Sequence, residues 1–547
     1  MARKDNRSKD RKRGAKATSR ASGASRGLVH PADVATAPEE AQHWLLSGTA
    51  VLLYLALAKL IIHLLTNGGY GYHRDELYYI ACGNHLAWGF VDHPPLTPFI
   101  AKLITSTFGT SLAAIRLIPA LAGAATVFVA GRIAKEAGGR LFAQFLTAFA
   151  VLIGANYLFF GTILTTNVFD QLLWAVALYL FVVILRRGEP KHWIWLGVVF
   201  GLGLLNKHTM IFLGAGLAGG LLFTPERERL KDRWAWIAAA IAFVIFLPNL
   251  VWEVQNGWPT IEFLKRAEIN RMPTLSPGLF FAGQAMGLHV LLVPVWLIGL
   301  WRALRAKDAP WMRPIGVAYV LLFVYFMLTR AKHYYLVPFY PALLAFGAVW
   351  IGGWVRERKL CWVRAVIVLV LLAGGVFLAP LSLPILAPEE VIEYADRINP
   401  GTRVVPVGES RMPAVFQDMF GWEEMVAAVA EAYHALPHED RAIAAVSANN
   451  YGQAAAIDFF GEDYGLPKAV SSHNAYWYWG PRDYTGEVML TVGVRPQALS
   501  SAFESGVVVG TVEHPYVVWY ETDQPIILWR DMKIPLRDAW SRMRLFY

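Results

Sequence analysis

Charged residues are scarce in this chain, and cysteine is almost absent. Only 17% of the 547 residues are Asp, Glu, Lys or Arg, whereas 56% are hydrophobic, and the mean hydropathy is +0.38. This composition excludes an ordinary soluble protein and indicates a polytopic membrane protein. The two cysteines, Cys82 and Cys361, fall in a loop and in an expected membrane helix. They argue against a structural disulfide and exclude a cysteine metal cluster.

The chain also lacks the layout of a cleaved signal peptide, because no short apolar core with a small-residue cleavage site follows its basic start. Residues 1–40 mix Lys and Arg with Ser, Gly and Ala, and they cannot bury enough apolar surface to fold alone. We expect a disordered, basic cytoplasmic tail that helps to orient the first helix. Nucleic-acid binding is the alternative for such a tail, but we expect no nucleic-acid partner.

Long apolar runs are abundant, and each needs about 20 residues to cross the hydrocarbon core as a helix. One apolar stretch, 193–223, is too long for a single span and is interrupted by Asn206, Lys207 and His208. It predicts a hairpin of two short helices that turns at Lys207, which brings the total to eleven spans within 41–387. The other nine runs are 44–66, 111–134, 140–160, 167–185, 234–252, 279–300, 314–329, 335–354 and 362–386.

Five short loops between these runs are basic, and in an eleven-span chain all five fall on the side of the basic tail. This is the positive-inside pattern, so the tail side is expected to be the cytoplasmic side of the cell's inner (plasma) membrane. The loop that starts at His73, the loop 253–277 and everything after about Ala387 are then extracytoplasmic. The basic loops are 135–140, 186–192, 225–233, 301–313 and 355–359.

Residues 388–547 have a mixed, soluble composition in which short strand-like runs alternate with amphipathic helical segments. This pattern predicts an extracytoplasmic α/β domain. The expected strands lie in RVVPVG, AIAAVS, GEVMLTVGV, VVVGTV and PIILW.

The loop between the first two spans carries most of the candidate chemistry. Asp75 and Glu76 are adjacent acids in a segment patterned as a short amphipathic helix, and Asp92 and His93 follow in the same loop. A carboxylate beside aromatic residues at a membrane surface is desolvated enough to act as a general base. The alternative is an interfacial acid paired with Arg74.

Cations are predicted on the outer side, where the orientation rule disfavours them, which suggests an anion such as a phosphate there. Snorkelling to lipid headgroups is the alternative. Asn167 and Asp170 open the fourth span on the same side, where an acid either caps the helix or faces a cavity beside Asp75. The cations are Lys207, His208, Arg266, Arg271, Arg330, Lys332 and His333, the last followed by Tyr334.

The sequence assigns no cofactor with certainty. Asp92, His93, Glu253, His289 and His333 leave a divalent metal open, although HExxH or a comparable spacing is absent from the sequence.

Taken together, HRDELYY (73–79), VDHPPL (91–96), NKHTM (206–210), FLPNLVWEVQNGWP (246–259) and KHYYLVPFYPALL (332–344) resemble the bacterial glycosyltransferase family 39. That family includes relatives of protein O-mannosyltransferases and lipid A aminoarabinose transferases. Residues 449–481 also resemble a bacterial branch of it. The resemblance implies a membrane enzyme of the GT-C fold with an α-helical membrane domain.

The resemblance further implies inverting transfer of a sugar from a polyprenyl-phosphate donor to a protein, lipid or glycan acceptor on the outer face. Asp75 takes the position of the catalytic carboxylate, with Glu76 as its neighbour and with Asp92 and His93 as a second polar pair. His93 stands where relatives often have Lys, and the family's second acid aligns best with Asn167. The departing phosphate is expected at Lys207, Arg271, Lys332 or His333. A transporter or flippase of a lipid-linked sugar is the alternative function.

Overall fold

The computed structural model describes residues 44–269, 276–398 and 410–547. Residues Leu45–Tyr547 form one compact unit. The predicted basic tail, the strand expected in RVVPVG and the candidate cation Arg271 lie outside the described residues.

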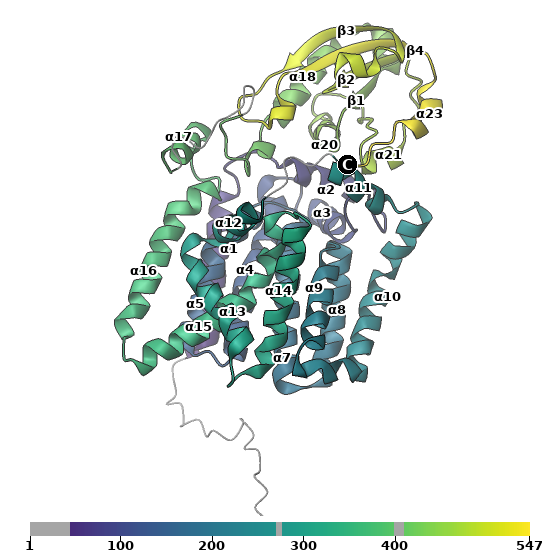
Figure 1. Ribbon diagram of the computed structural model, residues 1–547. Coiled ribbons are helices and arrows are strands. Elements are labelled where there is room, and N and C mark those ends of the chain that lie inside the picture. Colours follow the sequence, from purple (N-terminus) through teal and green to yellow (C-terminus); the bar gives the residue numbers. More distant parts are fainter. Residues whose placement is uncertain (1–43, 270–275, 399–409) are drawn as a thin grey trace, which may run out of the picture. The chain divides into compact units, whose positions relative to one another are not determined.

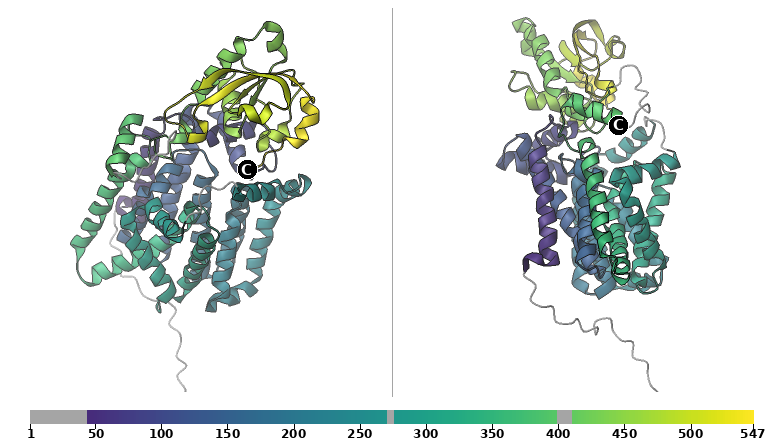
Figure 2. Two further views of the ribbon diagram at one scale, coloured as in Figure 1. Left: turned by 45° about the horizontal axis from the view of Figure 1, so that its top comes forward. Right: turned by 90° about the vertical axis from the view of Figure 1, so that its left-hand side faces the viewer.

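Long apolar helices make up most of this unit, and Figures 1 and 2 show them running side by side. Among the described residues, seven helical stretches are long and apolar enough to cross a membrane, and a bent pair makes an eighth if it counts as one span. Helices occupy all of the predicted apolar runs, but several are too short or too bent to meet this measure. The seven are α1 (Gly48–Thr66), α4 (Leu112–Glu136), α7 (Thr166–Arg187), α10 (Arg233–Gln255), α14 (Arg313–Leu328, with the turn from Pro310), α15 (Tyr340–Glu357, with the 3-10 turn from His333) and α16 (Cys361–Leu378, with the turn to Leu381).

Two of the predicted runs are broken. The run 140–160 divides at Gly154 into α5 (Leu141–Ile153) and α6 (Ala155–Phe160), and the ammonium of Lys59 from α1 donates to the carbonyls of Leu152 and Tyr157 on the two sides of the break. The run 279–300 bends by 96° between α12 (Pro277–Leu288) and α13 (Val293–Arg305). There the His289 ring accepts a hydrogen bond from the Leu291 amide at 3.1 Å. Buried polar side chains thus satisfy backbone groups that the breaks release.

The predicted hairpin is confirmed as two helices, α8 (Pro190–Asn206) and α9 (Met210–Leu222). The chain leaves α8 at Lys207, whose backbone is extended (φ −157°, ψ 132°). Helix α8 packs against α7 and α10, and α9 packs against α14. The turn 207–209 therefore lies at the ends of several helices.

The loop between α1 and α4 folds into α2 (Arg74–Asn84) and α3 (Leu96–Thr107), so the predicted short amphipathic helix is confirmed. Helix α2 begins with a capping box, in which the Asp75 amide donates to the His73 ring and the His73 amide donates to the Glu76 carboxylate. This cap fixes the first turn of α2, where both candidate acids stand.

A four-stranded sheet forms near the C-terminus, in the order β1-β2-β4-β3. Strand β1 pairs with β2 in parallel, whereas β4 runs antiparallel to β2 and β3. The strands β1 (Ala445–Ala448), β2 (Val488–Val492), β3 (Phe503–Val512) and β4 (Gln524–Met532) confirm four of the five predicted ones. The helices that follow α10 or accompany the sheet are α11 (Pro259–Ile269), α17 (Pro388–Ile398), α18 (Trp422–His434), α19 (His438–Ile443), α20 (Tyr451–Phe460), α21 (Ala475–Trp479), α22 (Pro496–Leu499) and α23 (Leu536–Ala539).

Helix α2 shares a hydrophobic core with the helices of this α/β region. Leu77, Tyr78 and Cys82 of α2 are buried in one cluster with residues of α18 and α20, such as Val426 and Ala455. Helix α2 is therefore held by the C-terminal α/β region as well as by the membrane helices.

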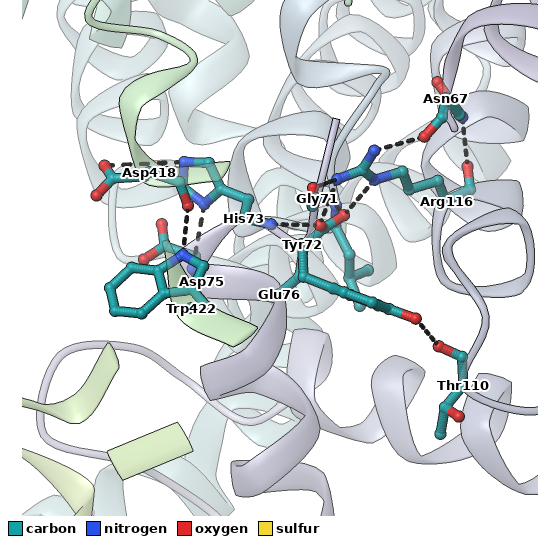
Figure 3. Close-up of polar contacts among 11 residues, drawn as sticks. Asn67, Gly71, Tyr72, His73, Asp75, Glu76, Thr110, Arg116, Asp418 and Trp422 are labelled. Carbon is teal, nitrogen blue, oxygen red and sulfur yellow. Dashed lines mark hydrogen bonds and ion pairs between the residues drawn. The ribbon is translucent and has the colours of Figure 1, made fainter. Parts of the chain in front are cut away.

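On its membrane side, Glu76 of α2 forms an ion pair with Arg116 of α4, and both side chains are fully buried (Figure 3). The guanidinium donates to both Glu76 oxygens, at 3.0 and 2.8 Å, and to the carbonyls of Asn67 and Gly71. The Leu164 amide, just before α7, donates to Glu76 Oε1 at 3.0 Å. A buried pair with this many hydrogen bonds is satisfied as a whole, and the loss of one member leaves an uncompensated charge.

We expect Glu76→Gln to lower the free energy of unfolding by about 3–5 kcal/mol, because it strands the Arg116 charge inside the protein. Thermal unfolding of the purified protein in detergent, followed by tryptophan fluorescence, measures the change. Glu189→Gln is the control, since Glu189 pairs with Lys191 at an exposed helix end and its loss should leave the midpoint unchanged. Equal midpoints for Glu76→Gln and the wild type would contradict a structural role for the pair.

Candidate active site

Asp75 lies in the first turn of α2, and the Tyr451 hydroxyl of α20 donates a hydrogen bond to its Oδ1 at 3.1 Å. The Tyr451 ring packs against Tyr78 of α2, with 4.4 Å between centroids, and stacks on His473 at 5.4 Å. The guanidinium of Arg74 lies 5.3 Å from the Tyr451 ring centroid. A residue of the α/β region thus contacts the candidate catalytic carboxylate directly.

The environment of Asp75 favours its ionised form. Burial alone would raise the pKa of this carboxyl, but the charges of His73 and Arg74, the Tyr451 hydrogen bond and the charge of Lys332 together lower the pKa below its usual value. Asp75 therefore carries a negative charge at neutral pH, as a general base or an orienting carboxylate must.

Asp92 and His93 both contact Tyr78 of α2. The Tyr78 hydroxyl donates to Asp92 Oδ1 at 2.9 Å, and burial raises the pKa of Asp92, with Asp75 as a further contributor. His93 is buried, with its ring centroid 4.9 Å from those of both Tyr79 and Phe90 and its Nδ1 3.0 Å from the Pro94 carbonyl. This position makes His93 part of an aromatic cluster.

Lys207 stands at the turn between α8 and α9, and its ammonium donates to Asn167 Oδ1 at 2.5 Å. The ammonium also lies 5.5 and 5.1 Å from the ring centroids of Tyr334 and Tyr335. Its electrostatic partners include Asp170, Lys332 and Asp75. Lys207 therefore connects the start of α7, the segment after α14 and the first turn of α2.

Asn167 and Asp170 both face this turn. Asn167 accepts from Lys207, and the buried Asp170 accepts from the Thr209 hydroxyl at 3.1 Å through each of its oxygens. The sequence did not decide which of Asn167 and Asp170 faces the site. Both do, because Asn167 contacts Lys207 and Asp170 contacts Thr209, the first and last residues of the segment 207–209.

The segment after α14 contributes a second cation. Lys332 is exposed, and its ammonium lies 5.7 Å from the Tyr334 ring centroid, so Lys207 and Lys332 lie near the same tyrosine. His333 is anchored by its carbonyl, which accepts from Gln284 of α12 at 2.8 Å. His208 turns elsewhere, with Nε2 3.3 Å from Asn249 Oδ1 of α10.

The structure thus brings Asp75, Asn167, Asp170, Lys207, Lys332 and Tyr334 into one cluster. Asp92 and His93 adjoin it through Tyr78, while His208 belongs to a neighbouring contact with α10. Glu76, although adjacent to Asp75 in the sequence, has both oxygens engaged by Arg116, Leu164 and His73.

Sequence reasoning missed Tyr451, Arg116 and Thr209. Arg116 carried a usable signal, because an arginine inside an apolar run implies a buried partner. Tyr451 falls in the segment 449–481 that resembles a branch of the family, but it lies 376 positions from Asp75, and nothing in the sequence marked the two as neighbours.

The described residues contain no group of three or more His, Cys, Asp or Glu that could hold a metal ion. The cluster around Asp75 instead combines carboxylates with ammonium groups and aromatic rings. The ammonium groups suit an anionic part of a ligand, and the carboxylates and aromatic rings suit a polar, uncharged part beside it.

Comparison with known proteins places this arrangement in a family context. Residues 92–252 match the model of the dolichyl-phosphate-mannose-protein mannosyltransferase family. A lipid A galacturonosyltransferase, RgtD, from Rhizobium johnstonii is 26% identical in an alignment of 275 residues that covers 48% of this chain. The match spans 55% of RgtD, so the chain covers about half the length of this curated relative.

Solved structures extend the comparison across the fold. The crystal structure of ArnT from Cupriavidus metallidurans bound to undecaprenyl phosphate matches with a TM-score of 0.56 and 15% identity, over 88% of this chain and 97% of ArnT. The apo structure of the same protein gives a TM-score of 0.55. The resemblance that the sequence motifs suggested is therefore confirmed. The chain is a multi-pass membrane protein of the GT-C fold, and its residues 92–252 are similar to the dolichyl-phosphate-mannose-protein mannosyltransferase family.

Proposed function

We propose that this protein is a membrane glycosyltransferase that moves a sugar from a polyprenyl-phosphate donor to an acceptor on the extracytoplasmic face of the inner membrane. The observation that carries the proposal is the cluster in which Asp75, held by Tyr451, lies near two ammonium groups, those of Lys207 and Lys332, which are 5.5 and 5.7 Å from the ring centroid of Tyr334. The name of its relative, a lipid A galacturonosyltransferase, and the undecaprenyl phosphate bound to its structural neighbour support the same reaction class. The acceptor in this proposal is a protein, a lipid or a glycan.

The cluster supplies what an inverting transfer requires. Asp75 takes the proton of the acceptor hydroxyl while that oxygen attacks the anomeric carbon, and the bond from this carbon to the phosphate oxygen breaks. The polyprenyl phosphate leaves with the bonding electron pair. Lys207 and Lys332 stabilise the negative charge that grows on it, and Asn167 orients the Lys207 ammonium.

The other acids have separate roles in this proposal. Glu76 positions α2 through Arg116 and does not touch the substrate, whereas Asp170 holds the turn that carries Lys207 through Thr209. Asp92, held by Tyr78, lies close enough to Asp75 to act on the donor sugar or its phosphate, together with His93.

The topology is part of the proposal. Residues 1–40 form a cytoplasmic tail, 41–387 the membrane domain and 388–547 an extracytoplasmic domain. The basic loops support this orientation, because all five lie on the side that the positive-inside rule assigns to the cytoplasm.

Reconstitution tests the proposal. We expect full-length protein in proteoliposomes to move label from one of a panel of radiolabelled polyprenyl-phosphate sugars to a product in a membrane lipid and glycan extract. Asp75→Asn should slow transfer by about 10²–10⁴-fold, because the general base is lost. Glu228→Gln, which removes an exposed acid that pairs with Lys231, is the control and should transfer at the wild-type rate. Donor that stays intact while crossing the bilayer equally in the wild type and Asp75→Asn would refute the proposal.

Tyr451 offers a second test, through the pH dependence of the reaction. Its hydrogen bond lowers the pKa of Asp75, so Tyr451→Phe should raise that pKa and move the acidic limb of the kcat/KM profile to higher pH. Tyr476→Phe is the matched control, because the Tyr476 hydroxyl donates to Asp458 within the α/β region. Superimposable acidic limbs for Tyr451→Phe and the wild type would exclude Tyr451 from control of Asp75.

Lys207 offers a third test. We expect Lys207→Met to lower kcat by about 10²–10³-fold, since it removes a charge aimed at the leaving phosphate. Lys191→Met changes an exposed lysine at the other end of the same helix and should leave kcat unchanged. An unchanged kcat with Lys207→Met would assign phosphate stabilisation to other residues.

A further inference from the structure

A cavity of about 730 Å³ lies at the opposite end of the helices from Asp75. It is formed by the α4–α5 connection and the ends of α13, α15 and α16. Helix α15 follows the turn that contains Tyr334, spans 18 residues with a rise of roughly 27 Å, and lines the cavity with its second half, from Val349 to Glu357. In Figure 1 the connection between α15 and α16 accordingly lies at the far end of α16 from the strands. None of its lining residues belongs to the Asp75 cluster.

Arginines dominate the charge of this cavity. Arg140, Arg302, Arg356 and Arg364 line it, against the acids Asp308 and Glu357. Arg302 is neutralised by Asp308, with both guanidinium nitrogens paired to both carboxylate oxygens at 3.0 and 2.7 Å. The other three arginines form no ion pair with a described residue, which leaves the cavity with a net positive charge.

Arg364 is the best defined of these cations. Its guanidinium lies 5.4 Å from the ring centroid of Phe142, and its Nε is buried without a hydrogen-bond partner among the described residues. A buried guanidinium N–H without a partner is costly unless a ligand supplies the acceptor. Arg364 thus points to an anionic or strongly accepting ligand.

Aromatic residues line the same cavity. Trp350 and Trp354 of α15 are stacked, with 6.4 Å between centroids and 15° between ring planes, and Phe142 lies in the same lining. At Gly353 a Cβ would meet no heavy atom within 4 Å, so this face of α15 is open. The cavity therefore pairs cations with an aromatic surface.

Helix α16, which contributes Arg364, is loosely packed. Only 11% of the most apolar 18-residue stretch of this helix is buried inside the protein, and Trp362 and Leu369 are 65% and 62% exposed. Its apolar surface continues from the cavity along the membrane-spanning part of the helix. Acyl chains can therefore lie along the helix whose first turn supplies a cation.

We propose that this cavity binds the headgroup of an anionic phospholipid, with the phosphate on Arg364 and Arg140 and the acyl chains along α16. Guanidinium groups bind phosphate oxygens through paired, charge-assisted hydrogen bonds. A basic cavity between membrane helices is suited to an anionic headgroup, and the aromatic wall adds apolar contact that a free phosphate ion does not use. The proposal is independent of the transfer reaction at Asp75.

Native mass spectrometry of the full-length protein, released from detergent containing phosphatidylglycerol or phosphatidylcholine, tests this site. We expect the wild type to retain phosphatidylglycerol preferentially, and Arg364→Gln to weaken this binding about fivefold, as expected for the loss of one cation from an anionic lipid site. Arg140→Gln should act in the same direction. Arg305→Gln is the matched control, because Arg305 ends α13 outside the cavity lining.

Three outcomes would overturn the proposal. They are equal retention of the two lipids, equal retention by Arg364→Gln and the wild type, and loss of bound phosphatidylglycerol on addition of millimolar inorganic phosphate. The last outcome would identify a site for a free phosphate ion. Because the readout is lipid retention, none of these results bears on whether Asp75 supports glycosyl transfer.

Discussion

The buried ion pair between Glu76 and Arg116 is the interaction on which the candidate site depends. Charge inside an apolar helix bundle is costly unless it is paired and fully hydrogen-bonded, and this pair meets both conditions. Its hydrogen bonds join the end of α1, the start of α2, the first half of α4 and the approach to α7. Since Asp75 precedes Glu76 in the same helical turn, fixing Glu76 also fixes the direction of Asp75.

The two adjacent acids show why a sequence motif does not assign roles. Neighbouring residues of a helix point about 100° apart, so Glu76 faces α4 while Asp75 faces Tyr451 and the lysines. The sequence predicted that chemistry gathers in this loop, and in the structure Asp75 lies in the same helical turn as Glu76. The sequence could not predict which of the two acids forms the buried ion pair, because its partner Arg116 lies 40 residues away.

Much of the remaining fold could be predicted, since apolar periodicity marks helices and the break at Lys207 marked a hairpin. The break at Gly154 could not, because it depends on the buried Lys59 side chain of another helix, which satisfies backbone groups only after the helices have packed. The 96° bend at His289 was not predicted either, although the His289 ring accepts from an amide only two residues away. Lys207 and Lys332, in contrast, could be identified from the sequence, because their positive charge lies on the side where the positive-inside rule disfavours it. Tyr451 needed the shared core of α2 and α20 to reach Asp75.

This shared core has a consequence for the proposed reaction. Leu77 and Tyr78 of α2 are buried with residues of α18 and α20, so the α/β region cannot swing away from Asp75 without exposing apolar surface at roughly 25 cal/mol per Å². A substrate must therefore enter beside this contact rather than through its opening. The Tyr451 hydroxyl occupies Oδ1 of Asp75, and within the described residues no hydrogen bond engages Oδ2. An acceptor hydroxyl that approaches Oδ2 leaves the contact intact, whereas one that requires Oδ1 must displace a tyrosine held by Tyr78, His473 and Arg74. In the proposed enzyme the α/β region thus takes part in acceptor choice through one carboxylate oxygen.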